Sequence, residues 1–288
     1  MKKVIHMKGN GFVVFQSDFG LEECTVVQCS GVAFTLAKRD EFFHLEHACH
    51  EISLFTIHEA SFRITQALHA WPEYTAYVSV VDPTVGSERQ SVVAITNDNK
   101  FIVTPNNGAL SDISKTVGIK ALREIDDKHR NAPEGSATFD GRDLYIPVAT
   151  LLATNQMTFE EVGRELPLDS IVMLPESVVT TEENAIHTNV SVLDKHFGSL
   201  WTNICIDEFR NMFDFDTDVR VLVTKNGETL FEQEVPFGES FFAAKGLSEP
   251  VIYTTELRKV GVALFQDSFA KRYNVDSGFD YKISFFKI

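Results

Sequence analysis

Asp82 and Arg89 lie in a loop that follows an expected buried strand, and a carboxylate and a guanidinium in such a place can hold a polar reactant. Residues 77–81 (YVSVV) are mostly β-branched or aromatic, which favours a strand, and Asp82 and Pro83 end it. In an open α/β sheet, ligands bind just beyond the carboxyl ends of the strands. We therefore expect Asp82 and Arg89 to lie at a site, although Asp-Pro pairs also occur in ordinary surface turns.

Two further expected strands end in polar loops of the same kind. Residues 12–15 lead into Asp18, and residues 101–104 lead into Asn106 and Asn107. Three strands that end in such side chains predict one polar cleft at one edge of a sheet, lined by the carboxylates and the two amides. The alternative for the Asn-Asn-Gly segment is a simple turn, because Asn and Gly tolerate left-handed backbone.

The elements that would position these loops alternate between strands and helices. Residues 57–71 are the clearest expected helix, with apolar residues at helical spacing and a Pro after the last turn. The strand at residues 77–81 follows, and this β-α-β order favours parallel pairing. Residues 92–96 and 101–104 predict a hairpin. Residues 144–153 form an apolar segment that we interpret as a helix, with its Pro in the first turn.

The pattern changes in the C-terminal part of the chain. Short expected strands with turn signals between them predict an antiparallel barrel or sandwich, and Asn226-Gly227 is a strong hairpin turn. Proline-containing, polar sequence separates the two parts. We expect an α/β N-terminal domain with a central sheet and flanking helices at residues 1–168, a linker at residues 169–186, and an antiparallel, barrel-like all-β C-terminal domain at residues 187–288.

The composition excludes several classes of partner. The 288 residues carry a formal net charge of −15, which repels nucleic acid and anionic membrane surfaces. The first residues lack the apolar run of a signal peptide, and no stretch of 18 apolar residues occurs. We expect a cytoplasmic protein with reduced thiols that binds neither nucleic acid nor membrane. A cationic small ligand is compatible with the charge.

A metal site is not expected. None of the four cysteines forms a C-x-x-C pair, which disfavours a structural zinc site. His47, Cys49 and His50 are closely spaced, but the His-Glu pairs in the chain lack the second His of an H-E-x-x-H motif.

Five segments together carry a family resemblance. They are SDFG at residues 17–20, VVDPTVGSER at 80–89, PNNG at 105–108, TFDGRD at 138–143 and DKHFGSLWTNI at 194–204. In this order they resemble the S-adenosylmethionine (SAM) hydrolases, or SAM hydroxide adenosyltransferases, which are related to the SAM-dependent fluorinases and chlorinases. The resemblance spans residue 12 to about residue 285.

The resemblance implies an activity and an assembly. Water or hydroxide displaces methionine at C5′ of SAM and gives adenosine and L-methionine, with SAM as substrate and with neither cofactor nor metal. It also implies a homotrimer whose sites lie at subunit interfaces, between the N-terminal domain of one chain and the C-terminal domain of the next. SAM or adenosine is then the expected ligand.

The catalytic residues that the resemblance implies are Asp82, Arg89 and Asp140. In the family an Asp, an Arg and a His orient the water, and Asp82 and Arg89 fall on the first two. The segment at residues 138–143 commonly has a His in the family where this chain has Asp140. Asp140 can serve as a general base, can pair with Arg89 in competition with Asp82, or can have no role in the chemistry.

Several other positions match binding contacts of the family. Asp18 matches the residue that holds the ribose diol, and Glu23 and Asp194 fall near the methionine ammonium. Phe55 matches an aromatic residue that covers the nucleoside, and Phe197 lies in the loop of the C-terminal domain that meets it.

The C-terminal half departs from the family pattern at two of the binding positions. Ser199 stands where an Asn usually contacts the adenine, and Glu256 lies near a position where a Ser commonly meets the methionine carboxylate. Glu256 would repel that carboxylate unless Arg258 or Lys259 offsets its charge.

These observations leave two main hypotheses and a weaker third. The first is SAM hydrolysis by a water held between Asp82 and Arg89, with Asp140 assisting. The second is a diverged protein that binds SAM, adenosine or another nucleoside without hydrolysing it, which the departures at Asp140, Ser199 and Glu256 motivate. The third is a SAM-dependent halogenase, which the two carboxylates disfavour because they would repel a halide ion.

Overall fold

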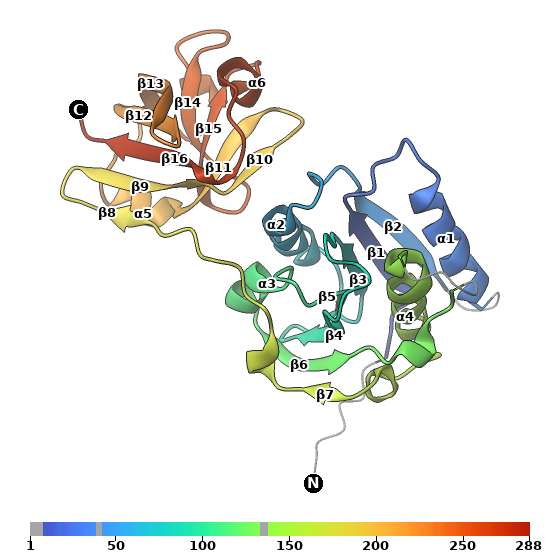
Figure 1. Ribbon diagram of the computed structural model, residues 1–288. Helices are drawn as coiled ribbons and strands as arrows, with labels where there is room; N and C mark the ends of the chain where they lie inside the picture. The colour runs from blue at the N-terminus through green and yellow to red at the C-terminus, as the bar shows by residue number, and fades with distance from the viewer. Residues whose placement is uncertain (1–7, 39–41, 133–137) are drawn as a thin grey trace. The chain divides into compact units, whose positions relative to one another are not determined.

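The computed structural model describes residues 8–38, 42–132 and 138–288. The chain divides into two compact units, Met1–Leu174 and Pro175–Ile288, which are drawn in blue to yellow-green and in yellow to red in Figure 1. Each unit has its own sheet and its own apolar core.

The first unit is built on a seven-stranded sheet with the order β2-β1-β3-β5-β4-β6-β7. Neighbouring strands among β1, β2, β3 and β5 pair in parallel, whereas β4, β6 and β7 add antiparallel pairings. The strands are β1 (Phe12–Ser17), β2 (His44–Cys49), β3 (Ala76–Val80), β4 (Ser91–Thr96), β5 (Phe101–Pro105), β6 (Ile119–Glu124) and β7 (Glu165–Leu166).

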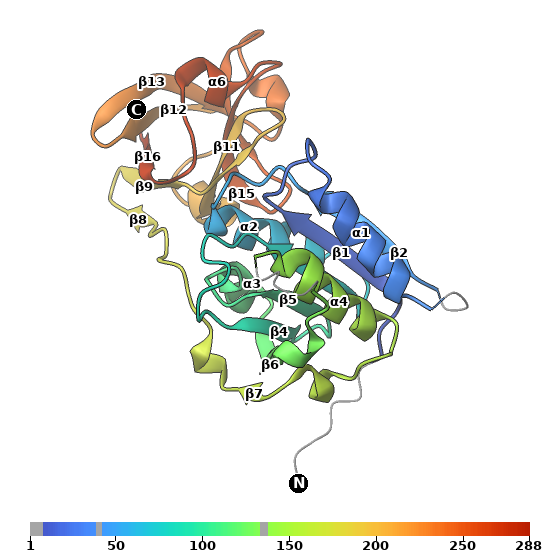
Figure 2. The same cartoon turned by 45° about the vertical axis from the view of Figure 1, so that its right-hand side comes forward.

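Helices cover both faces of this sheet (Figures 1 and 2). Helices α1 (Thr25–Leu36) and α4 (Ile146–Ala153) lie together on one face, and α2 (Ile57–Leu68) and α3 (Ser111–Thr116) lie together on the other. Successive strand side chains point to opposite faces, so Val13 and Phe15 join the core under α1 and α4, whereas Val14 joins the core under α2 and α3.

The expected connections in this unit are confirmed. The strand that follows α2 pairs with β1 in parallel, as the β-α-β order predicts. Strands β4 and β5 form the expected antiparallel hairpin. The expected helix at residues 57–71 ends earlier, at Leu68, where Trp71 closes a tight turn by donating its backbone N–H to the Leu68 carbonyl.

The helix expected at residues 144–153 has an irregular start. A five-residue π-helix, Gly141–Tyr145, precedes α4, and Pro147 lies in the first turn of α4, where its missing N–H costs nothing. Such π-helical turns are rare and occur often at functional sites. This one follows Asp140 and contains Arg142 and Asp143.

Short 3₁₀ helices and a tied-down segment complete the first unit. The 3₁₀ helices are Asp127–His129, Phe159–Val162 and Leu168–Ser170. The Asn106 amide donates to the Ser170 carbonyl and accepts from the Val172 backbone N–H, while Ser111 accepts from the Leu174 N–H. Residues 170–174 are therefore held on the first unit.

The second unit is a nine-stranded sheet in the order β10-β11-β15-β14-β13-β12-β16-β9-β8. Its strands are β8 (Thr180–Thr181), β9 (Ala185–Val190), β10 (Val192–Asp194), β11 (Ser199–Cys205), β12 (Thr217–Lys225), β13 (Glu228–Phe237), β14 (Pro250–Thr254), β15 (Lys259–Leu264) and β16 (Gly278–Phe286). Its helical segments are α5 (Ile206–Arg210), the 3₁₀ turn Phe241–Ala243 and α6 (Phe269–Tyr273).

This sheet curls into a half-barrel. The hydroxyl of Thr188 in β9 donates to the side-chain oxygen of Asn203 in β11, although the two strands lie near opposite ends of the strand order. Asn226 and Gly227 both have positive φ and turn β12 into β13, which confirms the hairpin expected there. The pairing within this unit is antiparallel except between β13 and β14.

Within residues 8–38, 42–132 and 138–288, no helix combines the length and the apolar character that crossing a bilayer requires.

Candidate active site

The carboxyl edge of the parallel strands gathers the polar loops of the first unit. Asp18 follows β1, His50 follows β2, Asp82 follows β3 and Asn106 follows β5. These strands run in the same direction, so their carboxyl ends meet at one edge of the sheet. This is the place where open α/β sheets bind their ligands.

One nitrogen of Arg89 joins the two candidate carboxylates. Arg89 Nη2 donates to Asp82 Oδ2, and the same atom donates to Asp140 Oδ2 at 2.8 Å. All three groups are largely removed from water, with side-chain exposures of 5% for Asp82, 11% for Arg89 and 6% for Asp140. The structure thus brings the three predicted catalytic side chains into direct contact.

Further hydrogen bonds fix the orientation of Asp82 and Arg89. Asp82 Oδ1 accepts from the backbone N–H and the hydroxyl of Thr84, each at 3.2 Å. Arg89 Nη1 donates to the Ser91 hydroxyl at 2.7 Å, and that hydroxyl lies 2.9 Å from the hydroxyl of Tyr145. Burial by itself would lower the pKa of Arg89, but the hydrogen bonds to the two carboxylates outweigh that effect. The pKa of Arg89 is therefore raised above its ordinary value, and the guanidinium keeps its charge.

Arg130 is a residue of this cluster that the sequence did not indicate. It lies just after the 3₁₀ helix Asp127–His129, and its Nη1 donates to Asp140 Oδ1 at 2.6 Å. Its Nε donates to Asp127 Oδ1 at 2.7 Å. Both oxygens of Asp140 therefore face a guanidinium, one from Arg89 and one from Arg130.

Asp18 and Phe55 are in contact, and the loop of Asp18 packs against the segment that leads to Asp140. Asp18 Oδ2 accepts the backbone N–H of Phe55 at 3.0 Å, and Phe55 has a positive φ and a ring that is 66% exposed. The ring of Phe19 packs edge-on against the ring of Phe139, with centroids 5.7 Å apart. This contact joins the Asp18 loop to the segment that carries Asp140.

The two predicted Asn side chains are engaged within the chain. Asn107 Nδ2 donates to the Val81 carbonyl at 2.9 Å, directly before Asp82, and its Oδ1 accepts the Ala109 N–H. Asn106 bonds Ser170 and Val172 as described above. Both amides thus hold loops at the strand edge in place.

The closely spaced His side chains form a hydrogen-bonded chain with a buried serine. Ser17 Oγ lies 2.7 Å from His50 Nδ1, and His50 Nε2 lies 2.8 Å from His47 Nδ1. Burial and, to a smaller extent, the neighbouring His47 together lower the pKa of His50 to about 4. Among the described residues, no group of three or more His, Cys, Asp and Glu side chains is placed to hold a metal ion.

In the second unit, one predicted residue bonds the hydroxyl of Tyr253, and the charges of two others act on that hydroxyl. Asp194 in β10 pairs with Ser199 in β11, and Ser199 hydrogen-bonds Tyr253. Trp201 Nε1 donates to the same hydroxyl at 2.7 Å. Burial raises the pKa of Tyr253, and the charges of Asp194 and Glu256 act in the same direction. Tyr253 was not singled out in the sequence, where it reads as an ordinary strand residue.

The remaining predicted residues lie on the surface of their units. Glu23 is exposed, just before α1. Phe197 is exposed, and its ring packs edge-on against His196. Arg258, one of the two cations considered as a partner for Glu256, donates from Nη2 to both carboxylate oxygens of Asp207, at 2.9 and 3.1 Å.

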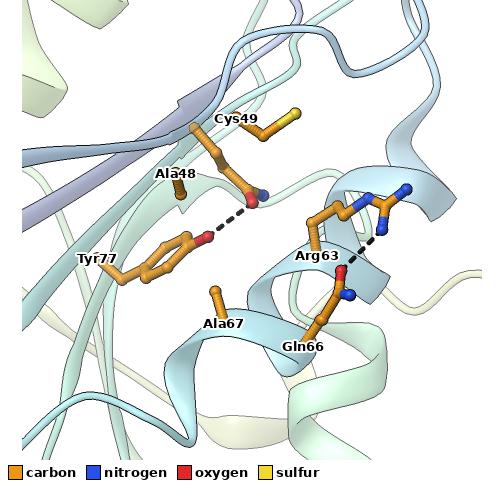
Figure 3. A pocket seen from close by; sticks show the side chains of 7 residues that line it. Ala48, Cys49, Arg63, Gln66, Ala67 and Tyr77 are labelled. Atoms are coloured by element: carbon orange, nitrogen blue, oxygen red, sulfur yellow. Dashed lines mark hydrogen bonds between the residues drawn. The ribbon is translucent and has the colours of Figure 1, made fainter. Parts of the chain in front are cut away.

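A cavity of about 310 Å³ lies between β1, β2, β3 and α2 (Figure 3). Tyr77 donates to the side chain of Gln16 at its floor, and Arg63 donates to Gln66 at its rim. None of the residues that line it belongs to the predicted site, and Gln16 is further bonded to Ala60 and Ser79. Its buried polar groups stabilise the packing of α2 on the sheet.

Comparisons with known proteins agree with the resemblance. Residues 13–163 match the family model of the SAM hydroxide adenosyltransferase N-terminal domain, and residues 188–281 match that of the C-terminal domain. An (R)-S-adenosyl-L-methionine hydrolase of Methanocaldococcus jannaschii is 31% identical over 92% of both chains. A fluorinase of Actinopolyspora mzabensis is 23% identical over 94% of this chain and 96% of its own.

A solved structure has the same fold. A conserved protein from Thermotoga maritima superposes with a TM-score of 0.84 at 26% identity, over 96% of this chain and 100% of its own. The two family models together cover most of the chain. The protein belongs to the SAM hydroxide adenosyltransferase family.

Proposed function

We propose that this protein hydrolyses S-adenosyl-L-methionine to adenosine and L-methionine. Both family models and the named hydrolases support this activity. The observation that carries the proposal is the buried contact of Asp82, Arg89 and Asp140 at the carboxyl edge of the sheet. The substrate is a cation at sulfur, which suits a chain with a net charge of −15.

The reaction needs a nucleophile far more than it needs an acid. A water oxygen forms a bond to C5′ while the bond between C5′ and sulfur breaks. The electron pair of the broken bond stays on sulfur. Methionine therefore departs as a neutral thioether, and no proton has to be delivered to it. Water is a weak nucleophile, so the site must orient it and accept one of its protons.

The buried cluster supplies groups for both tasks. Each carboxylate oxygen has two lone pairs, so Asp82 Oδ2 can accept a hydrogen bond from water while it also accepts one from Arg89. Arg89 is held by Ser91 on one nitrogen and by two carboxylates on the other, which fixes its direction. We assign Asp82 and Arg89 to holding the water, and Asp140 to assisting them by accepting the proton that the water loses as its oxygen bonds to C5′.

The substrate contacts are part of the proposal. We assign the ribose diol to Asp18, the nucleoside face to Phe55, and the amino-acid part of the substrate to the groups around Tyr253, with Asp194, Ser199 and Glu256. Asn106 and Asn107 act through the loops that they hold. No cofactor is needed for this chemistry.

We further propose a homotrimer in which the first unit of one chain and the second unit of another complete each site. Exposed apolar residues on both units favour such an assembly, because a monomer would leave them in water. They include Leu54 and Phe55 on the first unit and Phe197 and Phe242 on the second.

The test is product analysis with a matched variant. The purified protein is incubated with SAM, with and without chloride, and adenosine and methionine are separated by chromatography. We expect both products from the wild type in equal amounts, no dependence on chloride, and no product from Asp82→Asn. Bound but unconverted SAM would favour a binding protein, and a chloride-dependent halogenated nucleoside would favour a halogenase.

A further inference from the structure

Arg130 and Asp140 form a second ion pair in the site, next to the pair of Asp82 and Arg89. Arg130 Nη1 lies 2.6 Å from Asp140 Oδ1, while Arg89 Nη2 lies 2.8 Å from Asp140 Oδ2. The four side chains therefore alternate in charge along one chain of contacts. Arg130 is 23% exposed, and the other three are more deeply buried.

The charge of this cluster depends on Arg130. Asp82 and Arg89 cancel each other, and Asp140 adds a negative charge at a position where the resemblance leads us to expect a neutral His. A buried charge without a partner is costly, so Asp140 requires a second cation. Arg130 is the group that supplies it.

Arg130 is held firmly in this position. Its Nε bonds Asp127 at 2.7 Å, and its backbone N–H donates to the Asp127 carbonyl at 2.9 Å. The next backbone N–H, of Asn131, donates to the Asp143 carbonyl in the π-helix at 2.8 Å. The loop of Arg130 and the segment of Asp140 are thus tied together by backbone as well as by side chains.

We propose that Arg130 is a positioning residue for hydrolysis, which balances the charge of Asp140 and holds its second oxygen so that the first can share Arg89 with Asp82. Without Arg130, Asp140 would compete more strongly for Arg89 and draw it from Asp82. This inference rests on the proposed function. It assigns a role to a loop that the sequence presents only as polar.

The test is a double-mutant cycle on turnover. Arg130→Gln leaves the cluster with an excess negative charge, and Asp140→His alone leaves it with an excess positive charge. The double variant Arg130→Gln/Asp140→His restores neutrality. We expect each single variant to lower kcat by about 10-fold or more. If the two effects were independent, kcat of the double variant would fall by the product of the two factors. We expect kcat of the double variant to be higher than that value by about 10-fold or more.

Two controls separate positioning from folding. Lys128→Gln removes a cation from the same loop, where Lys128 pairs with Asp126, and should leave kcat unchanged. Arg130→Lys keeps the charge but loses the planar fork, so its kcat should lie between those of wild type and Arg130→Gln. Thermal unfolding of each variant shows whether a lost rate reflects lost structure.

The double variant gives a readout that a purely structural role would not move. A loop that had merely lost its structure in Arg130→Gln would not regain turnover when Asp140 is replaced as well. If the wild type is active but Arg130→Gln has the same kcat, the role of Arg130 is wrong and the proposed function stands. The same holds if the effects of the two single variants on kcat simply multiply in the double variant. A wild type that releases no adenosine from SAM would instead overturn the proposed function and the inference with it.

Discussion

Asp82 and Asp140 accept hydrogen bonds from the same atom, Nη2 of Arg89, although they come from segments far apart in the chain. Two carboxylates so close would repel each other without the guanidinium between them. The shared nitrogen brings acceptor oxygens of both carboxylates together at one fixed cation. This arrangement is suited to orienting a water molecule.

Replacing Asp82 should abolish turnover and leave the fold intact. Asp82→Asn keeps the shape of the side chain but removes the charge that faces Arg89, so we expect kcat to fall by at least about 100-fold. Steady-state release of adenosine measures this. The exposed Asp169 provides the matched control, since Asp169→Asn should behave as wild type. Retained turnover in Asp82→Asn would exclude the role assigned to this carboxylate.

Replacing Arg89 by Lys should be almost as harmful, even though the charge is kept. Arg89 uses one nitrogen for two carboxylates and another for Ser91, and a single ammonium cannot reproduce that fork. We expect kcat to fall by about 10-fold or more. Arg164→Lys is the control, because Arg164 pairs with Glu124 at the surface. Equal rates for Arg89→Lys and wild type would show that only the charge matters.

Tyr253→Phe should weaken substrate binding more than it slows the chemistry. The hydroxyl bonds Trp201 and Ser199 in the second unit, whereas the groups assigned to the water belong to the first unit. We expect KM for SAM to rise several-fold, with a smaller change in kcat. Tyr281→Phe, at a ring that lies under Lys225, is the control. A loss confined to kcat would contradict the assignment of this cluster to substrate binding.

The buried His50 predicts a loss of stability at mildly acidic pH. Its pKa is lowered from 6.5 to about 4 in the folded protein, so between these values the unfolded chain binds a proton that the folded protein does not. The free energy of unfolding therefore falls as pH drops from about 6.5 toward 4, by about 1 to 2 kcal/mol at pH 5.

Denaturant unfolding at pH 7.5 and pH 5 measures this loss. His50→Asn should reduce the difference between the two pH values, because Asn can still accept from Ser17 but does not titrate. His69→Asn, at an exposed histidine, should leave the difference unchanged. An unchanged difference in His50→Asn would show that other groups cause the acid sensitivity.

Much of the fold follows from local patterns in the sequence. Apolar periodicity and turn chemistry, which neighbouring residues determine, indicate β1, β3 and β5, the hairpin of β4 and β5 and the Asn226-Gly227 turn. No strand was expected at β2, most of whose side chains are polar and exposed. The end of α2 at Leu68 and the π-helix before α4 could not be foreseen. They depend on tertiary packing and on hydrogen bonds to distant residues.

Part of the site could also be predicted from local sequence. Asp82 and Arg89 share one loop, so their proximity is a local property, and the resemblance added Asp140. Arg130 was missed because its partner, Asp140, is 10 residues further along the sequence and the resemblance does not mark Arg130. The available signal was charge balance, since two buried carboxylates and one guanidinium leave a charge that needs a cation. Tyr253 was missed because a Tyr in a strand is ordinary.

The most direct test of the account follows the oxygen atom of the attacking water. The wild-type protein is incubated with SAM in water labelled with heavy oxygen, and the adenosine is analysed by mass spectrometry with fragmentation. We expect one labelled oxygen, located on the 5′-hydroxyl of adenosine, with unlabelled methionine. Adenosine without the label, or a nucleoside that carries another group at C5′, would contradict the claim that this site delivers water to SAM.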